Sequence, residues 1–197
     1  MNPILRELTN PVRNTSYSDF SEAALVAAFV ANTDRHRVFM EIVHRYKEKV
    51  YYHIRRILLD HDDTDDAAQN TFIRVWENLG SFRNECALYS WIYRIATNEA
   101  LTLLRKKRNN TSLEAVNVEL SKLIDSGAYL SGDEIERKLQ KMLLTLPDKQ
   151  KLVFQLKYFE DLNYEQISEI TGTSVGALKA SYFHAVRKIE EFLKREI

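Results

Sequence analysis

The chain has 197 residues, and its 28 Lys and Arg balance 28 Asp and Glu, so the formal net charge at pH 7 is zero. The single cysteine, Cys86, excludes an internal disulfide and a cysteine-based zinc site, and no apolar run approaches the roughly 20 residues that span a bilayer. Scarce glycine and proline, with few alternating β-branched runs, predict an all-α fold. We expect a soluble, cytoplasmic protein without membrane insertion.

The first part of the chain predicts a helical hairpin preceded by a loose arm. Residues 1–18 are polar and show no period. Ser21 or Asp19 is the expected N-cap of a first helix. Apolar residues at helical spacing predict a second helix from about Arg35 to Leu59, which should pack against the first.

An acidic cluster, Asp60 to Asp66, comes next. Its carboxylates are expected to cap a helix, with Asp63 as the N-cap, and to complement the positive end of that helix. Asp62, Asp63 and Asp66 also match the carboxylate pattern with which isoprenoid synthases hold magnesium diphosphate. That function needs a second acidic motif on a facing helix, which the sequence lacks, so we expect no metal site.

The helix predicted from Ala67 to Leu79 has two different faces. Phe72 and Trp76 are expected to lie in the core. The polar face is either plain surface or a docking face for a basic partner. The candidate docking residues are Asp65, Asp66, Gln69, Asn70 and Arg74.

The helix predicted from Leu88 to Asn109 carries the strongest candidate nucleic-acid surface. From Arg83 to Arg108 there are six basic and two acidic residues, and local charge is what a polyanion meets. An aromatic, an amide and guanidinium groups on one face can stack on bases, bond base edges and neutralise phosphates. A core helix with a solvated basic end is the alternative. The candidates on this face and in the basic run are Trp91, Arg94, Asn98, Arg105 and Lys106.

The apolar period is lost from Asn109 to Gly132, which predicts an acidic linker. Ser131 and Glu134 form a capping box for a helix that Pro147 closes. The predicted organisation is an arm (1–18), a first helical domain (19–109), a linker (110–132) and a second helical domain (133–197).

The last 50 residues predict a helix-turn-helix. Asn163 and Gln166 form a capping box for a short helix, Gly172 lies in a tight turn, and Ser174 caps a longer helix with a basic outer face. A helical hairpin without DNA contacts is the alternative, and the basic face argues against it. The residues expected to reach DNA are Ser174, Lys179, Ala180, Ser181, Phe183, His184 and Lys188.

Both halves resemble one family, the small two-domain extracytoplasmic-function sigma factors of the sigma-70 family. Asp63 to Leu79 resembles region 2.2, which docks on the clamp helices of the largest RNA polymerase subunit. Phe82 to Asn109 resembles regions 2.3 and 2.4, which melt and read the −10 element. Leu146 to Ile189 resembles region 4, which reads the −35 element. The fold implied is a region 2 bundle and a region 4 helix-turn-helix joined by the linker.

The resemblance implies a role for each candidate. The residues from Asp65 to Arg74 would bind core polymerase, Phe82 and Arg83 would cup a flipped −10 base, and the candidates from Trp91 to Lys106 would contact the melted strand. The candidates from Ser174 to Lys188 would meet the −35 duplex. The implied partners are bacterial core RNA polymerase, promoter DNA and, as a further candidate, an anti-sigma factor. No catalytic residue and no cofactor are implied.

The chain departs from the family pattern at several of these positions. Ala67 and Ala68 replace larger aliphatic residues, and Asn70 replaces a common acid. Ser181 stands where many relatives have arginine, and His184 where another basic residue is frequent. The promoter sequence therefore cannot be copied from relatives. A stand-alone helix-turn-helix regulator, which binds duplex DNA by itself, is the alternative function.

Overall fold

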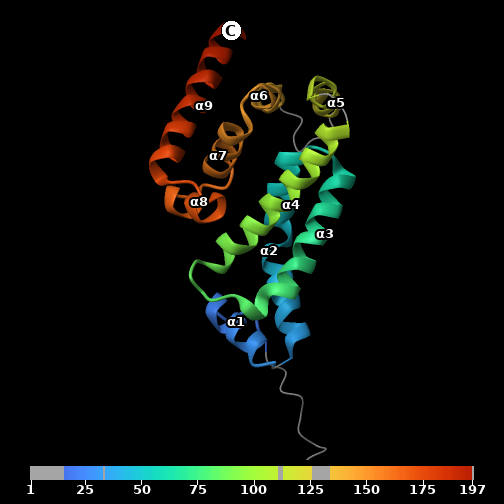
Figure 1. Cartoon of the computed structure of the whole chain (residues 1–197), viewed down its shortest axis with the longest axis vertical. Coiled ribbons are helices and arrows are strands. Elements are labelled where there is room, and N and C mark those ends of the chain that lie inside the picture. The colour runs from blue at the N-terminus through green and yellow to red at the C-terminus, as the bar shows by residue number, and fades with distance from the viewer. Residues whose placement is uncertain (1–15, 33, 111–112, 126–133, 197) are drawn as a thin grey trace, which may run out of the picture.

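The computed structural model describes residues 16–32, 34–110, 113–125 and 134–196. These residues form helices without any strand, which confirms the predicted all-α class (Figure 1). No helix in the described ranges is both long and apolar enough to cross a membrane. The helices are α1 (Glu22–Val30), α2 (Arg35–Leu58), α3 (His61–Asn78), α4 (Leu88–Asn110), α5 (Leu113–Asp125), α6 (Glu134–Leu144), α7 (Asp148–Tyr158), α8 (Tyr164–Thr171) and α9 (Val175–Glu196), with a short 3₁₀ turn, η2 (Leu79–Ser81), after α3.

Helices α1 to α4 form a first body, in which α2, α3 and α4 lie side by side and α1 covers one end (Figure 1). Each helix contributes the apolar stripe that its sequence predicts, because residues three and four apart share a face. The fully buried side chains of this core include Leu25, Phe29, Val38, Ile42, Ile54, Val75, Leu79, Ile92 and Ala96.

Ser21 is confirmed as the N-cap of α1, but the start of α3 differs from the prediction. Helix α3 begins at His61, and the Asp60 carboxylate accepts a hydrogen bond from the Asp63 backbone N–H at 2.9 Å. Asp63 as the cap and Ala67 as the start were therefore wrong. Leu59 ends α2 in a left-handed conformation, where the pattern placed the end of this helix, and α3 starts two residues later. As a consequence, the acidic cluster lies inside the first turns of α3.

The end of the predicted arm is held by one arginine. The Arg45 guanidinium donates to the carbonyl oxygens of Tyr17, Ser18 and Phe20 at 2.7–2.8 Å, and to the Glu41 carboxylate at 2.7 Å. Residues 16–18, which were predicted to be loose, are therefore anchored. The rest of that prediction, residues 1–15, lies outside the described residues.

Helix α5 lies inside the segment predicted as an unstructured linker. Leu120 and Ile124 are buried against Leu59, and Lys141 of α6 pairs with Asp125 at 2.5 Å. The prediction was wrong because it overlooked a helical period in this polar segment, where Leu113, Val116, Leu120 and Ile124 recur at steps of three and four residues. The predicted cap Ser131 lies outside the described residues.

Helices α6 to α9 form a second body that contains the helix-turn-helix. The capping box is confirmed: Asn163 Oδ1 accepts from the Gln166 N–H at 2.8 Å, and Gln166 Oε1 accepts from the Asn163 N–H at 3.0 Å. Gly172 ends α8 with φ +67°, a conformation that favours glycine. Ser174 Oγ accepts from the Ala177 N–H at the start of α9.

The two bodies are packed together rather than separated. Val153, Leu156, Ile167 and Ile170 of the second body belong to the same buried apolar cluster as Leu104 of α4. Figure 1 shows α8 next to α4. Helix α4 therefore contacts both bodies.

The position of Trp76 corrects the sequence prediction. Its side chain is 37% exposed instead of lying in the core. It packs edge-on against Phe29 and Phe39, with ring centroids 5.3 and 5.0 Å away, and the Arg35 guanidinium lies 5.3 Å from its ring. Trp76 thus packs at the edge of the core, where it is partly exposed to solvent, and the Arg35 guanidinium makes a cation–π contact with its ring.

A polar network is buried between α2 and α4. The Thr97 hydroxyl donates to the Tyr93 carbonyl oxygen at 2.7 Å, so it accepts a hydrogen bond from His53 Nε2 at 2.8 Å. This arrangement places the imidazole proton on Nε2. Burial lowers the pKa of His53 from 6.5 to about 3, so the ring is neutral in the folded protein.

We expect the His53→Gln variant to lose part of the acid sensitivity of the protein. Below pH 6.5 the unfolded chain binds a proton that the folded chain does not, so stability is complete above pH 6.5 and falls as the pH drops. Between pH 7 and pH 5, His53 should cost about 2 kcal/mol of unfolding free energy. Urea unfolding at both pH values measures this loss. His61→Gln, at an exposed position, is the control, and equal pH dependence in wild type and His53→Gln would contradict the expectation.

Candidate polymerase and nucleic-acid surfaces

The polar face of α3 is fully presented to solvent. Asp65, Asp66, Gln69, Asn70 and Arg74 are all exposed, as helical spacing from the buried Ala67, Thr71 and Val75 requires. Helix α3 therefore brings the candidate polymerase-binding residues together on one surface. Their role stays a prediction.

One apolar residue lies within this polar face. Ile73 is 48% exposed, and its neighbours along α3 are Gln69, Asn70 and Glu77. Sequence reasoning missed Ile73 because an isolated isoleucine reads as a core residue. An exposed apolar side chain surrounded by polar ones is typical of the centre of a protein–protein interface.

The acidic cluster is partly engaged within the first body. The Asp63 carboxylate, with 19% of its side chain exposed, forms an ion pair with Lys107 near the end of α4. In the described part of the chain, no group of three or more His, Cys, Asp or Glu side chains is arranged to hold a metal ion. The ion pair with Lys107 argues against the diphosphate-binding alternative, which needs Asp63 available for magnesium.

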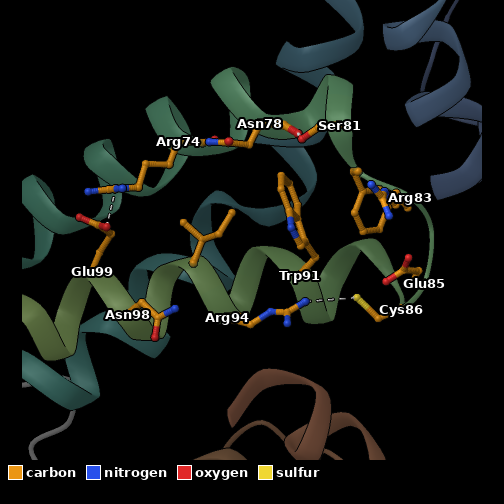
Figure 2. A pocket seen from close by; sticks show the side chains of 12 residues that line it. Arg74, Asn78, Ser81, Arg83, Glu85, Cys86, Trp91, Arg94, Asn98 and Glu99 are labelled. Atoms are coloured by element: carbon orange, nitrogen blue, oxygen red, sulfur yellow. Dashed lines mark hydrogen bonds and ion pairs between the residues drawn. The ribbon is translucent and has the colours of Figure 1, made fainter. Parts of the chain in front are cut away.

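A cavity of about 480 Å³ lies where α3, η2 and the following loop meet α4 (Figure 2). The Phe82 and Trp91 rings are 5.0 Å apart at 38°. Trp91 is half-buried, so one side of its ring supports the helix while the rest borders the cavity. The predicted −10 residues that the structure brings together here are Phe82, Arg83, Trp91, Arg94 and Asn98.

The rim of this cavity carries a net excess of positive charge. Its lining has three arginines, Arg74, Arg83 and Arg94, and two glutamates, Glu85 and Glu99. The Glu99 carboxylate pairs with Arg74 at 2.5 Å (Figure 2). Arg94 lies 3.8 Å from the sulfur of Cys86, and burial raises the pKa of that thiol, which keeps it uncharged at neutral pH. An anionic ligand is favoured in such a cavity.

Several lining residues were missed by sequence reasoning. Asn78 and Ser81 border the cavity from α3 and η2, and Arg74 reaches it from the helix that also carries the candidate polymerase surface. No local pattern could have identified Asn78 and Ser81 as cavity residues, because the α4 residues that they face belong to a different helix. Arg74 therefore lies between the two candidate surfaces.

Arg105 and Lys106 do not line this cavity. Both are exposed near the end of α4. Arg105 instead borders a second cleft, of about 280 Å³, which lies between α4 and the second body and also includes Asn98. The candidate −10 residues therefore extend along α4 from the first cavity into this cleft.

The exposed face of α9 carries most of the predicted −35 residues. Lys179, Ala180, Phe183, His184 and Lys188 are exposed, and Phe183 reaches 63%. The Lys179 ammonium lies 5.7 Å from the centre of the Tyr164 ring. Ser174 is exposed at the start of the helix. These side chains are presented as a helix-turn-helix presents its recognition helix.

Ser181 differs from the other residues of this set. It was expected to point outward with Ala180, but it is half-buried and lines the cleft shared with Asn98. Residues of α4, among them Asn98 and Leu101, line the same cleft, so Ser181 is less accessible than the prediction required.

The described residues form an all-helical protein that carries a helix-turn-helix in the second body and an aromatic, basic cavity in the first. A family model for Sigma-70 region 2 matches residues 42–110, and one for Sigma-70, region 4 matches residues 136–189. The ECF RNA polymerase sigma factor SigW of Bacillus subtilis is 34% identical over 151 residues, which cover 72% of this chain and 81% of SigW. The ECF RNA polymerase sigma-E factor of Haemophilus influenzae is 31% identical over 164 residues, which cover 78% and 86% of the two chains.

Solved structures agree with these relatives in fold. CnrH, in complex with the cytosolic domain of CnrY, superposes with a TM-score of 0.67 at 21% identity and covers 89% of this chain and 99% of its own. The sigma factor RpoE of Bartonella quintana, in complex with the anti-sigma factor NepR, has a TM-score of 0.62 at 20% identity and covers 79% and 96%. The chain belongs to the ECF group of the sigma-70 family of RNA polymerase sigma factors.

We expect Asn98→Ala to weaken promoter opening by the holoenzyme. Asn98 is exposed beside the cavity, so its removal costs the fold little, but it removes an amide whose contact with a base edge is worth about 1–3 kcal/mol of discrimination. Permanganate footprinting of −10 thymines should show several-fold lower reactivity and a relaxed base preference. Asn109→Ala, an exposed amide further along α4, is the control. An unchanged footprint with an unchanged base preference would remove Asn98 from the site.

Proposed function

We propose that this sigma factor binds core RNA polymerase through the exposed face of α3, holds the melted −10 strand at the cavity beside Trp91 and docks α9 on the −35 duplex. The observation that carries the proposal is the cavity between α3 and α4. This cavity is lined by two aromatic rings together with Arg83, Arg94 and Asn98, and it borders α3, the helix that carries the candidate polymerase surface. A melted strand could therefore be captured next to the point where polymerase is bound.

The energetics explain why the chain acts together with polymerase. Stacking of a base on an aromatic ring is worth about 1–3 kcal/mol, which helps to hold a strand open but does not open a duplex unaided. The cavity presents one such aromatic pair, Phe82 and Trp91. Opening therefore depends on the free energy that polymerase supplies. This dependence distinguishes the proposal from a stand-alone regulator, which would bind its site tightly alone.

The chain would contribute no bond-making step of its own. We assign synthesis of RNA to the polymerase, so the protein acts as a recognition subunit and works in the cytoplasm with the transcription machinery. An anti-sigma factor is a further proposed partner, because the structure of the similar sigma factor from Bartonella quintana contains one.

The α3 face is tested by charge reversal. Asp66→Lys should weaken binding to core polymerase about tenfold, equivalent to about 1.4 kcal/mol, because it places a cation where we propose that a basic partner docks. Titration of core polymerase against the fluorescently labelled chain measures the change. Glu48→Lys makes the same reversal at an exposed site on α2 and should leave binding unchanged. Equal affinities for wild type and Asp66→Lys would exclude this face.

The α9 face is tested through its salt dependence. If Lys179 contacts a phosphate, Lys179→Ala should weaken holoenzyme binding to all promoter variants and lower the slope of log K against log salt by about one. If it reads a base, the loss should concentrate at one position of the −35 element. Lys157→Ala is the matched control, since that ammonium also lies near the Tyr164 ring, at 5.9 Å, but on α7. Retention of both slope and sequence preference would take Lys179 out of the interface.

A further inference from the structure

One wall of the cavity beside Trp91 is a loop, residues 82–87, which connects η2 to α4. Phe82, Arg83 and Cys86 of this loop line the cavity, and Figure 2 shows Arg83 and Cys86 on the approach to α4. The loop has no regular secondary structure. Side chains on a loop are held less precisely than side chains on a helix, unless other contacts fix the loop. The precision of the cavity therefore depends on what holds the two ends of this loop.

Helix α4 has no capping side chain of its own. The Ala87 carbonyl oxygen accepts the first helical hydrogen bond, from the Trp91 N–H at 3.1 Å, so Ala87 occupies the N-cap position. Alanine has no side-chain acceptor for the N–H groups of the first turn. These groups must therefore be satisfied by another part of the chain or by water.

Glu22 of α1 supplies an acceptor. Its Oε2 accepts a hydrogen bond from the Leu88 backbone N–H at 3.0 Å, although the two residues are 66 positions apart, and its Oε1 accepts one from the Tyr46 hydroxyl of α2. Leu88 and Tyr46 are only 2% and 6% exposed. Burial, followed by the hydrogen bond to Glu22, raises the pKa of Tyr46, so the hydroxyl keeps its proton at neutral pH and acts as the donor. We call this carboxylate, with its bonds to α2 and α4, the Glu22 tether.

The position of Glu22 is fixed by its own surroundings. Ser21 caps α1, and the Arg45 guanidinium holds the carbonyl oxygens of Tyr17 and Phe20 immediately before that helix. Helix α1 also packs against η2, at the other end of the loop (Figure 1). Both ends of the loop are therefore held by α1.

We propose that Glu22 is a positioning residue for −10 recognition, because it fixes the loop that carries Phe82 and Arg83. This inference rests on the proposed function, since it assigns a determinant of base preference to the same cavity. A helix cap alone would stabilise α4 and do nothing more. The tether also sets where α4 begins relative to α1 and α2, so its loss alters the preference for bases in a chain that stays folded.

Three variants separate the tether from a helix cap. Glu22→Ala removes both. Glu22→Gln keeps the shape, and its amide can still accept from the Leu88 N–H and donate to the Tyr46 oxygen. Glu22→Ala combined with Ala87→Asp provides a cap from within the loop but leaves α1 and α2 unconnected to α4. Glu48→Ala, at an exposed position on α2, is the matched control.

The tether is measured first in the free full-length chain, by hydrogen exchange followed with NMR. The Leu88 amide should exchange about tenfold or more faster in Glu22→Ala than in wild type, because it loses its acceptor. Exchange should stay fast in the double variant, since an N-cap side chain bonds the second or third helical N–H rather than the first. The melting temperature should fall in Glu22→Ala and recover in the double variant. Glu22→Gln and Glu48→Ala should match wild type in both measurements.

Base preference is measured with the holoenzyme. The preferred −10 sequence is selected from a library randomised at that element, and transcription from its single-base variants gives the discrimination at each position. Glu22→Ala and the double variant should each lose about fivefold discrimination at one or more −10 positions, the lower limit of what one contact to a base edge contributes. Their −35 preference and their affinity for core polymerase should equal those of wild type. Glu22→Gln and Glu48→Ala should keep the −10 preference.

The outcomes distinguish the tether from the proposed function. Wild-type −10 preference in Glu22→Ala, or its full recovery in the double variant, would overturn the positioning role and leave Glu22 at most a helix cap. Unchanged exchange of the Leu88 amide in Glu22→Ala would remove the contact on which the inference rests. A wild-type holoenzyme without any −10 preference would instead overturn the proposed function, whatever the exchange rates in the free chain.

Discussion

Helix α4 is the element on which both bodies and both parts of the proposed strand-reading surface depend. One side of it supplies fully buried residues such as Ile92 and Ala96 to the first body. Another side meets the second body through Tyr93 and Arg108. The remaining side borders the cavity and cleft. In a helix of 3.6 residues per turn, adjacent residues point in directions about 100° apart. Ile92, Tyr93 and Arg94 are therefore adjacent in sequence, yet they lie in the first core, at the contact with the second body and at the cavity.

The basic run at the end of α4 illustrates how charge is divided between structure and binding. Lys107 pairs with Asp63 and Arg108 with Asp148, so both cations join elements of the fold. Arg105 and Lys106 are exposed and remain available to a polyanion. Segregated charge in the sequence predicts a basic surface at this end of α4, and its role in binding stays a prediction. Part of the positive charge is neutralised by carboxylates that are distant in sequence.

The sequence was a good guide wherever the determining interaction is local. The stripes of α2 and α4 and the Asn163 capping box follow from residues three or four apart. Two failures have a different cause, because the exposure of Trp76 and the partial burial of Ser181 are decided by contacts with other helices. Helix α5 is another case, since it has a helical period of its own that was overlooked among polar residues. The candidate site shows the same division, because its α4 residues were identifiable and the Asn78 and Ser81 contributions from the preceding segment were not.

The contacts between the two bodies could not be predicted from the sequence, because Glu160 bonds Arg56 and Tyr93, which are 104 and 67 residues away. The same holds near the end of α4, where Arg108 donates to Asp148, 40 residues further along the chain. Polar groups that are buried between packed elements each need a hydrogen-bond partner. The way the second body packs on α4 is therefore decided by pairs of residues that no local pattern contains.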